Sequence, residues 1–407
     1  MRILLVNDYG TPTGGAELLL ISLRRVLRAR GHDVRLFTSS AHPQPVPSVA
    51  DYECFGTTSA FRTLLQTFNP WAYWRLKEVL SQFHPHIVHV GLFLTQLSPL
   101  ILLPLRHIPT LYLAMWYRTI CPLGTKLLPD GTVCRNPLGT VCYRSGCLPL
   151  RDWGLLMLQL RLWHRWRDAF QVIVAHSASL QRRLDSEGVH ANEVVMGAVP
   201  VRPARPPLAS PPTIGFAGRL VREKGVDTLL LAFADVLRVI PEARLVIVGD
   251  GPERPHLVGL IHDLDLADVV LLPGQLPRAA MEDALSRVWV QVVPSRWEEP
   301  LGLAPLDAMM RGTAVIASNI GGLGETVQHG HSGLLVPPDD SKLLAEALLH
   351  LLGQQDVAER MGAAGRKIAL ERFTEERFGD HMLYTYEQML RGRKSPESVS
   401  GRTARPT

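Results

Sequence analysis

A proline-rich stretch near the middle of the chain constrains the fold more than any other feature. Residues 200–212 read PVRPARPPLASPP. Because proline fixes φ and lacks a backbone N–H, this density of prolines excludes a helix or a central strand. We interpret the stretch as a linker between two domains. The length of 407 residues agrees, since it exceeds what one ordinary core supports.

Strand and helix patterns alternate on both sides of the linker. The chain opens with a predicted strand at 2–6, a helix at 16–30 and a strand at 35–38, which form a βαβ unit. We therefore predict an α/β fold with two Rossmann-like domains, at 1–199 and 213–372. Further strands are predicted at 86–90, 110–114, 172–175, 213–216, 244–248, 269–272, 288–293 and 314–317.

The last predicted element is an amphipathic helix over 373–391. Apolar residues recur there at four-residue spacing, at Phe378, Met382, Tyr386 and Leu390. The basic residues 392–407 are predicted to form a disordered tail.

Charge and apolar content narrow the setting in which the protein works. The formal net charge of +5 comes from scattered arginines, which favours an anionic ligand or a membrane surface and requires no nucleic acid. The short apolar run before Asn7 fits a buried strand and not a signal peptide, and polar residues and prolines interrupt residues 92–105. Five cysteines do not indicate a disulfide-dependent secreted fold. We therefore expect a cytoplasmic protein.

A loop with two carboxylates leads into a helix of the second domain. Residues 294–312 read PSRWEEPLGLAPLDAMMRG, with a helix predicted at 304–311. Glu299 precedes this helix and Asp307 lies one turn inside it. The first N–H groups of a helix lack intrahelical acceptors, so they can bind a phosphate or another anionic oxygen. The groups in question belong to Gly302, Leu303 and Ala304.

Two further loops carry candidate ligand-binding residues. Arg219 and Lys224 follow Gly218 after a predicted strand and offer two cations to a diphosphate, although an ordinary solvated turn is the alternative. Gly14 and Gly15 precede the first helix, where the backbone can come close to a ligand. Neither GGAE nor GDGPER supplies the three-glycine dinucleotide fingerprint, which disfavours an oxidoreductase.

The motifs, in this order, resemble those of a known enzyme family. GRLVREKGVDTLL, LVIVGDGPER, VPSRWEEPLGLAPLDAM and IGGLGETVQHGHSGLLVPPDD resemble motifs of the retaining nucleotide-sugar glycosyltransferases of the GT-B fold, family 4 or group 1 type. GGAELLL, GHDV, PHIVHV and TICPLGTKLLPDGTVC resemble its N-terminal half. This group includes bacterial polysaccharide and lipopolysaccharide enzymes, and the resemblance extends to about Leu390.

The resemblance implies a role for each candidate residue. Glu299 would contact the donor sugar, and Asp307, where the family usually has Glu, would bind the nucleotide ribose. Arg219 and Lys224 would bind the donor diphosphate and stabilise the leaving group, so that no metal or cofactor is required. With Glu299 they form the predicted catalytic set. The remaining donor-binding residues would be Gly218, Gly302, Leu303 and Ala304, with Gly14 and Gly15 approaching across the cleft between the domains.

The resemblance also assigns the domains. The domain at 1–199 would bind the acceptor and the domain at 213–372 the nucleotide sugar. The helix at 373–391 would return to the first domain and let the cleft close.

One position departs from the family pattern. Where the family commonly has a His-Asp pair before the Cys-Pro, this chain has Met115 and Trp116 before Cys121 and Pro122. That His usually touches the donor sugar. A retaining transfer can proceed without it when the leaving phosphate takes the acceptor proton. His89 lies at a strand end, where a lone His is more often structural.

Two features each admit two interpretations. Four cysteines either hold a structural zinc or remain reduced thiols packed by a hairpin, and their spacing lacks the close pairs of most zinc modules. The Leu-rich segment 153–166 is either a core helix or an interfacial helix that brings the enzyme to a lipid-linked acceptor. The cysteines are Cys121, Cys134, Cys142 and Cys147.

The sequence therefore predicts a cytoplasmic glycosyltransferase, which on the interfacial-helix interpretation also makes peripheral contact with the inner face of a membrane. It would move a hexose-type sugar from a nucleotide diphosphate donor to a hydroxyl of a glycan or lipid-linked acceptor, with retention at the anomeric carbon. The alternatives are an inactive sugar-nucleotide-binding scaffold in a glycan-assembly complex and a nucleotide-sugar epimerase on the same fold.

Overall fold

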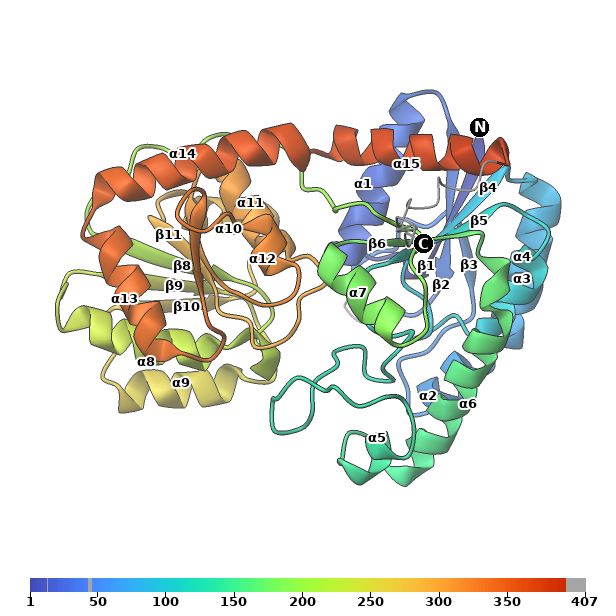
Figure 1. Ribbon diagram of the computed structural model, residues 1–407, viewed down its shortest axis with the longest axis horizontal. Coiled ribbons are helices and arrows are strands. Elements are labelled where there is room, and N and C mark those ends of the chain that lie inside the picture. Colours follow the sequence, from blue (N-terminus) through green and yellow to red (C-terminus); the bar gives the residue numbers. More distant parts are fainter. Residues whose placement is uncertain (13, 43–45, 393–407) are drawn as a thin grey trace, which may run out of the picture.

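Two α/β lobes lie side by side, and the last two helices run along one edge of both (Figure 1). The computed structural model describes residues 1–12, 14–42 and 46–392. The predicted disordered tail at 392–407 lies outside the described residues except for Gly392.

The first lobe is built on a seven-stranded parallel sheet with the order β3-β2-β1-β4-β5-β6-β7. Its strands are β1 (Arg2–Tyr9), β2 (Asp33–Ser39), β3 (Tyr52–Cys54), β4 (Ile87–Val90), β5 (Thr110–Ala114), β6 (Val172–Ala175) and β7 (Glu193–Val194). Its α-helices are α1 (Gly15–Ala29), α2 (Arg62–Thr67), α3 (Pro70–Phe83), α4 (Leu102–Leu105), α5 (Val141–Arg144), α6 (Leu150–Trp166) and α7 (Ala178–Ser186).

The second lobe has a six-stranded parallel sheet with the order β10-β9-β8-β11-β12-β13. Its strands are β8 (Thr213–Ala217), β9 (Arg244–Val248), β10 (Val270–Gly274), β11 (Val290–Val293), β12 (Ala314–Ser318) and β13 (Gly333–Val336). The later helices are α8 (Val226–Leu237), α9 (Arg254–Asp263), α10 (Arg278–Ser286), α11 (Leu303–Arg311), α12 (Leu323–Thr326), α13 (Ser341–Leu352), α14 (Gln355–Arg372) and α15 (Glu375–Leu390).

The central strand of the first lobe shows why the sheets are parallel and covered on both faces. Leu4 and Val6 belong to one core cluster, whereas Ile3 and Leu5 belong to another. Successive side chains of a strand point to opposite faces, so an unbroken apolar run needs helices on both sides. All four residues are fully buried.

The chain crosses between the lobes twice, and the two crossings lie side by side. Val199, before the linker, and Thr374, before α15, form an isolated parallel bridge. Residues 200–212, all of them described, form no helix or strand. Within them Arg205 forms an ion pair with Glu359 of α14 at 2.7 Å, so the linker lies on the second lobe.

The helix α15 completes the core of the first lobe. Its apolar residues pack with those of β1 and α1, and Arg30 of α1 pairs with Asp380 at 2.7 Å. Nδ1 of the buried His89 in β4 lies 2.5 Å from the hydroxyl oxygen of Tyr386. The predicted α/β fold with two Rossmann-like domains and a returning last helix is therefore confirmed.

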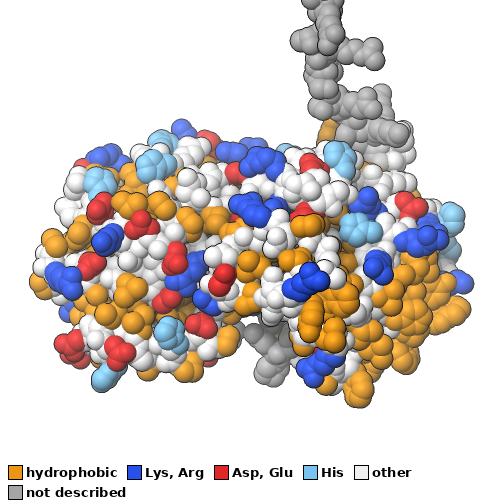
Figure 2. All heavy atoms as spheres, turned by 60° about the horizontal axis from the view of Figure 1, so that its bottom comes forward, with side chains coloured by type: hydrophobic (Ala, Val, Ile, Leu, Met, Phe, Trp, Pro, Cys, Tyr) orange, Lys and Arg blue, Asp and Glu red, His pale blue; other side chains and the backbone are white. Residues whose placement is uncertain are grey.

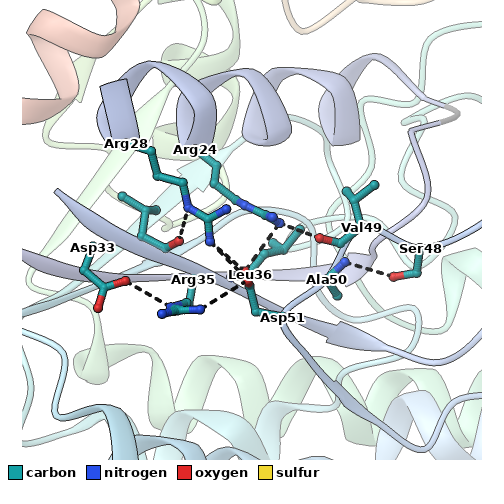
Figure 3. Close-up of polar contacts among 10 residues, drawn as sticks. Arg24, Arg28, Asp33, Arg35, Leu36, Ser48, Val49, Ala50 and Asp51 are labelled. Carbon is teal, nitrogen blue, oxygen red and sulfur yellow. Dashed lines mark hydrogen bonds and ion pairs between the residues drawn. The ribbon is translucent and has the colours of Figure 1, made fainter. Parts of the chain in front are cut away.

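Three arginines, in the second half of α1 and in β2, form ion pairs that stabilise the first lobe. Figure 3 shows them around the carboxylate of Asp51, with Arg28 at 3.1 Å, Arg24 at 3.4 Å and Arg35 at 3.7 Å. Asp51 also accepts the backbone N–H of Leu36 at 2.8 Å. This network joins the C-terminal half of α1 to the sheet.

The His89–Tyr386 contact generates a stability prediction. We expect Tyr386→Phe to lower the free energy of unfolding by about 1–3 kcal/mol, because it leaves a buried imidazole nitrogen without its partner. Denaturant unfolding measures this. Tyr384→Phe is the matched control, since Tyr384 lies on the same helix and is 62% exposed. Equal stability of the two variants would contradict the role given to Tyr386.

Candidate functional site

Two loops of the second lobe meet at the carboxyl ends of β8 and β11. The N–H of Arg296 donates to the carbonyl of Glu223 at 2.9 Å. Gly225 has a φ of 62°, and a Cβ there would lie 2.1 Å from the carbonyl oxygen of Pro294. Glycine permits both this backbone conformation and this close approach. The strand order reverses between β8 and β11, which is where open α/β sheets bind ligands.

The two loops place the ammonium of Lys224 against the carboxylate of Glu299. The Nζ–Oε1 distance is 2.5 Å, and Ser295 Oγ donates to the same oxygen at 2.7 Å. Burial alone would raise the pKa of Glu299, but the ion pair with Lys224 and the hydrogen bond from Ser295 hold the pKa below its usual value. Glu299 is therefore a carboxylate at neutral pH. The ammonium also lies 5.8 Å from the centroid of the Trp297 ring.

The first turn of α11 follows directly on this pair. Gly302 precedes the helix with a φ of 85°, a value that favours glycine. Pro305 occupies the third helical position, where a missing N–H breaks no intrahelical bond. The N–H groups of Leu303 and Ala304 have no intrahelical acceptor and can bind an anionic oxygen.

The backbone of Gly321 and Gly322 packs against the backbone of Glu299. Gly321 has a φ of 57°, and a Cβ there would lie 2.5 Å from the carbonyl oxygen of Glu299. The N–H of Gly322 donates to that carbonyl at 2.7 Å. Sequence reasoning assigned these glycines no role, although the adjacent glycines of IGGLGE were a signal that the backbone comes close there.

The β1–α1 loop of the first lobe reaches the same helix terminus. A Cβ at Gly15 would lie 2.7 Å from Cδ1 of Leu303, so this loop rests against the start of α11. Gly14 is the N-cap residue of α1, and the side chain of Glu17 folds over it. The structure thus brings Gly14, Gly15 and Leu303 together from opposite lobes.

Arg219 stands at the rim of this region. Its side chain is 73% exposed and forms an ion pair with Glu223 at 3.9 Å. Burial raises the pKa of Glu17, in the opposite lobe, to about 7, and the charge of Arg219 opposes this rise. The N–H of Gly218 donates to the carbonyl of Val248 at 3.0 Å, which anchors the start of the loop.

Asp307 lies apart from the Lys224–Glu299 pair. The guanidinium of Arg202, from the linker, contacts Asp307 Oδ1 at 3.4 Å and Glu282 Oε1 at 2.8 Å. Burial raises the pKa of Asp307, although nearby arginines oppose the rise. In the described part of the chain, no hydrogen bond or ion pair joins Asp307 to another predicted site residue.

Polar contacts behind Glu299 join the two lobes. Ser177 Oγ donates to the carbonyl of Pro300 at 2.5 Å. The N–H groups of Ala178 and Ser179, in the first turn of α7, donate to the carboxylate of Glu325 at 2.8 and 2.6 Å. A carboxylate of one lobe therefore caps a helix of the other. Since Pro300 follows Glu299, this junction also positions the candidate site.

Glu298 faces the first lobe, away from Lys224. It forms ion pairs with Arg135 at 3.1 Å and with Arg183 at 3.7 Å. The neighbouring Trp297 packs edge-on against Tyr117, with ring centroids 6.2 Å apart. Sequence reasoning missed both arginines, because they lie in the other half of the chain and no sequence pattern shows that they reach this loop.

The arrangement suits an anionic ligand that also carries hydroxyl groups. Arg219 and Lys224 supply positive charge, and the first turn of α11 supplies N–H donors. The carboxylate of Glu299 can accept hydrogen bonds from hydroxyls. A sugar joined to a diphosphate has both features.

Comparison with known proteins identifies the family. The model described as glycosyl transferases group 1 matches residues 202–368, and the model described as Glycosyltransferase Family 4 matches residues 13–114. The chain belongs to these glycosyltransferases.

A curated relative is similar to part of the chain. The chain is 39% identical over 166 residues to the GDP-mannose-dependent alpha-(1-6)-phosphatidylinositol monomannoside mannosyltransferase of Mycobacterium tuberculosis. The aligned region covers 39% of this chain and 43% of that protein. The chain spans about half the length of the curated relatives that it matches.

Two solved structures share the arrangement of both lobes. Sucrose-phosphate synthase from Thermosynechococcus elongatus has a TM-score of 0.74 and 24% identity, covering 97% of this chain and all of that one (100%). Anabaena HepE in complex with UDP-glucose has a TM-score of 0.68 and 18% identity, covering 95% of this chain and 100% of that one. At these identities the likeness shows the fold, and it confirms the predicted GT-B architecture.

This glycosyltransferase has no ionisable side chain at the position of the family's usual His. Met115 is 8% exposed and packs in the core of the first lobe. His89 is fully buried, and burial lowers its pKa to about 3. Neither residue therefore offers a proton-transferring group to the candidate site.

Four cysteines of this family member surround one apolar cavity of the first lobe. Burial raises the pKa of the Cys142 and Cys147 thiols. Leu127 and Val133 form an antiparallel bridge that closes a hairpin beside them. Among the described residues, no group of three or more His, Cys, Asp or Glu side chains is arranged to hold a metal ion. The cysteines are Cys121, Cys134, Cys142 and Cys147.

The Leu-rich segment at 153–166 falls within α6 and has two distinct faces. Leu156, Leu160 and Trp163 are buried, whereas Leu158 and Arg161 are exposed. One face is therefore core, and the other meets solvent. None of the helices described here combines the length and apolarity that crossing a bilayer requires.

A buried histidine near the lobe junction links stability to pH. Nδ1 of His176 lies 3.0 Å from the carbonyl oxygen of Val195, and burial lowers the pKa of His176 to about 4. An unfolded chain has the ordinary value of about 6.5. Between these values the unfolded chain binds more protons, so the free energy of unfolding falls as the pH falls through this window.

We expect His176→Gln to flatten this pH dependence by up to about 1.4 kcal/mol per pH unit. Denaturant unfolding from about pH 7 to about pH 5 measures the slope. His262→Gln is the control, because that side chain is 90% exposed and should leave the slope unchanged. An unchanged slope in His176→Gln would contradict the assignment of a neutral buried imidazole.

Proposed function

We propose that the chain is a retaining glycosyltransferase that moves a hexose-type sugar from a nucleotide diphosphate donor to a hydroxyl of a glycan or lipid-linked acceptor. One observation carries the proposal. The Lys224–Glu299 pair lies beside the first turn of α11, within the part of the chain that matches the group 1 model. A cation, helix N–H donors and a carboxylate together suit a sugar diphosphate.

The donor diphosphate would lie between the two loops and the start of α11. The ammonium of Lys224 has three N–H donors, so it can hold Glu299 and a phosphate oxygen at the same time. Arg219 adds a second cation, and Leu303 and Ala304 add backbone N–H groups. These charges stabilise the departing diphosphate, and in this proposal neither a metal nor another cofactor is needed.

The chemical step would retain the anomeric configuration. The bond from the anomeric carbon to the diphosphate oxygen breaks while the acceptor oxygen bonds to the same face of that carbon. The acceptor proton passes to the departing phosphate oxygen, so no protein base is required. This route agrees with Met115 at the position where the family usually has His. Glu299 would orient the sugar through its hydroxyls.

The relatives indicate which nucleotide sugars to test first as donors. One depends on GDP-mannose, and another was solved with UDP-glucose. We therefore propose UDP-sugars and GDP-sugars as the first donors to test. The ribose would meet Asp307, and the acceptor would enter from the first lobe past Gly14 and Gly15.

The proposed setting is the cytoplasm, with peripheral contact at the inner face of a membrane. The exposed Leu158 and Arg161 on α6 support this contact.

A second candidate function is an inactive sugar-nucleotide-binding scaffold. Met115 and Asp307 favour it, because both depart from the family pattern at positions near the donor. Calorimetry that shows donor binding, with no turnover of any donor in water or with any acceptor, would support this function over transfer.

The role of Lys224 can be tested directly. We expect Lys224→Ala to lower the kcat of donor hydrolysis or transfer about a hundredfold to a thousandfold, because charge on the leaving diphosphate loses its main partner. Release of nucleoside diphosphate measures the rate. Lys342→Ala, at an exposed position of α13, is the control.

A companion variant separates catalysis from folding. Removing Lys224 leaves Glu299 without its ion-pair partner, whereas Arg219→Ala removes an exposed side chain whose ion pair with Glu223 is long, at 3.9 Å. We expect Arg219→Ala to keep the wild-type melting temperature and still reduce kcat. Wild-type rates in both variants would exclude the proposed diphosphate role.

Asp307 in α11 gives a prediction in which the substitution improves donor binding. We expect Asp307→Glu to lower the KM for the donor about tenfold, because the added methylene lets the carboxylate reach the ribose hydroxyls. Steady-state kinetics with the preferred donor measures this. Asp356→Glu, on the exposed side of α14, is the control. An unchanged or higher KM would show that Asp307 does not bind ribose.

A further inference from the structure

The first lobe exposes a concentration of large apolar side chains. Figure 2 shows hydrophobic side chains gathered over the side of this lobe that carries α2, α3 and α6 in Figure 1, with Lys and Arg beside them. Six of them, each between 50% and 73% exposed, come from the short segment that includes α2 and the start of α3. We call this set the apolar face: Phe55, Phe61, Leu64, Phe68, Trp71 and Trp74.

The fold does not use these side chains for its own core. In α2, Leu65 is buried, and the hydroxyl of Thr67 donates to the carbonyl of Leu155 in α6 at 3.2 Å. In α3, Leu76 and Val79 are buried. The inner sides of both helices therefore hold the lobe together, while their outer sides remain apolar and exposed. Single exposed apolar residues are ordinary, but a contiguous group marks an interaction surface.

Neighbouring contacts hold the aromatic rings in place. Phe55 packs edge-on against Trp71, with ring centroids 5.4 Å apart. The ammonium of Lys77 lies 5.3 Å from the centroid of the Trp74 ring. Aromatic rings beside cations have an apolar body and a polar edge, which suits the boundary between hydrocarbon and water.

Most of the charge around the apolar face is positive, although Arg75 forms an ion pair with Glu78 of α3 at 2.6 Å. The segment 54–77 contains no Asp or Glu, and its cations are Arg62, Arg75 and Lys77. The segment 153–167, which includes most of α6, also contains no Asp or Glu, and its cations are Arg161, Arg165 and Arg167. Because α6 packs along α2, both sets surround the same region. These cations attract an anionic surface.

We infer that the apolar face binds the surface of a bilayer that contains anionic phospholipid. The aromatic rings would sit at headgroup level and the arginines and lysines would contact lipid phosphates. A bilayer fits better than a folded partner, because tryptophan and phenylalanine interleaved with Arg and Lys are the composition of interfacial helices.

This inference deepens the proposed function by naming the surface and the lipid charge behind the membrane contact. The segment before α6, which carries the four cysteines, contacts the loop of the second lobe that contains Arg219 and Lys224. There Arg222 donates to the carbonyls of Pro129 and Asp130 at 2.6 and 2.8 Å. An acceptor carried by the bilayer would therefore meet the protein near the segment that borders the candidate donor site.

Vesicle co-sedimentation of the full chain tests the inference. It needs neither donor nor acceptor, so its outcome is independent of transfer. We expect binding to phosphatidylcholine vesicles with about 30% phosphatidylglycerol, much weaker binding to phosphatidylcholine alone, and loss of binding at high salt. The double variant Phe61→Ser, Trp74→Ser should weaken binding to the anionic vesicles about tenfold or more.

Matched controls separate this surface from general apolarity and charge. Val239→Ser changes a side chain that is 65% exposed on the second lobe, and it should bind vesicles as the wild type does. Arg62→Glu should weaken binding, whereas Arg238→Glu, on the second lobe, should not. Equal binding of the wild type and the double variant would overturn the inference. So would self-association that the double variant abolishes while no vesicle binding occurs.

Discussion

The Lys224–Glu299 ion pair is partly buried, with the Lys224 side chain 19% exposed and the Glu299 side chain 7% exposed, so its surroundings must replace the water that the two charges lose. Desolvating two such charges costs several kcal/mol per ion unless geometry and further hydrogen bonds compensate. Here a serine hydroxyl shares the carboxylate oxygen, and a tryptophan ring lies near the ammonium. Bringing the two loops this close requires backbone to touch backbone, which accounts for Gly225, and Gly321 lets the loop after β12 approach the backbone of Glu299 in the same way.

The connections between the lobes lie behind this pair. The chain crosses twice at neighbouring positions, at Val199 and Thr374, and the carboxylate of Glu325 caps α7 on the same side. The exposed Arg219 stands at the rim, with Glu17 of the other lobe within range of its charge. The lobes are thus joined where the sugar would be held. Such a junction can act as a hinge for closing over a donor.

Sequence patterns were sufficient for the architecture, because apolar runs and loop glycines are local signals. They placed the central strands of both sheets, the returning helix and the loop residues Lys224 and Glu299, but they missed the edge strands β3, β7 and β13. Nothing in them showed that the two side chains touch. The partners from the other lobe could not be read from the sequence. Arg135 and Arg183 of the first lobe reach Glu298 only through tertiary packing.

The same limit applies to surfaces. The sequence left the segment at 153–166 open between a core helix and an interfacial helix, and no sequence pattern pointed to the rings from Phe61 to Trp74, which only their burial shows to be exposed. Asp307 shows the reverse case. Its sequence position predicts contact with a ribose, whereas the structure pairs it with Arg202.

The most direct measurement compares how a nucleoside, its monophosphate and its diphosphate raise the melting temperature, using the bases of the proposed donors. A ligand that binds the folded state raises the melting temperature according to its affinity. Because Lys224, Arg219 and the start of α11 would meet the second phosphate, we expect the diphosphate to stabilise the chain most and Lys224→Ala to remove that advantage. Equal shifts for the three ligands, or a diphosphate advantage that survives in Lys224→Ala, would contradict this site.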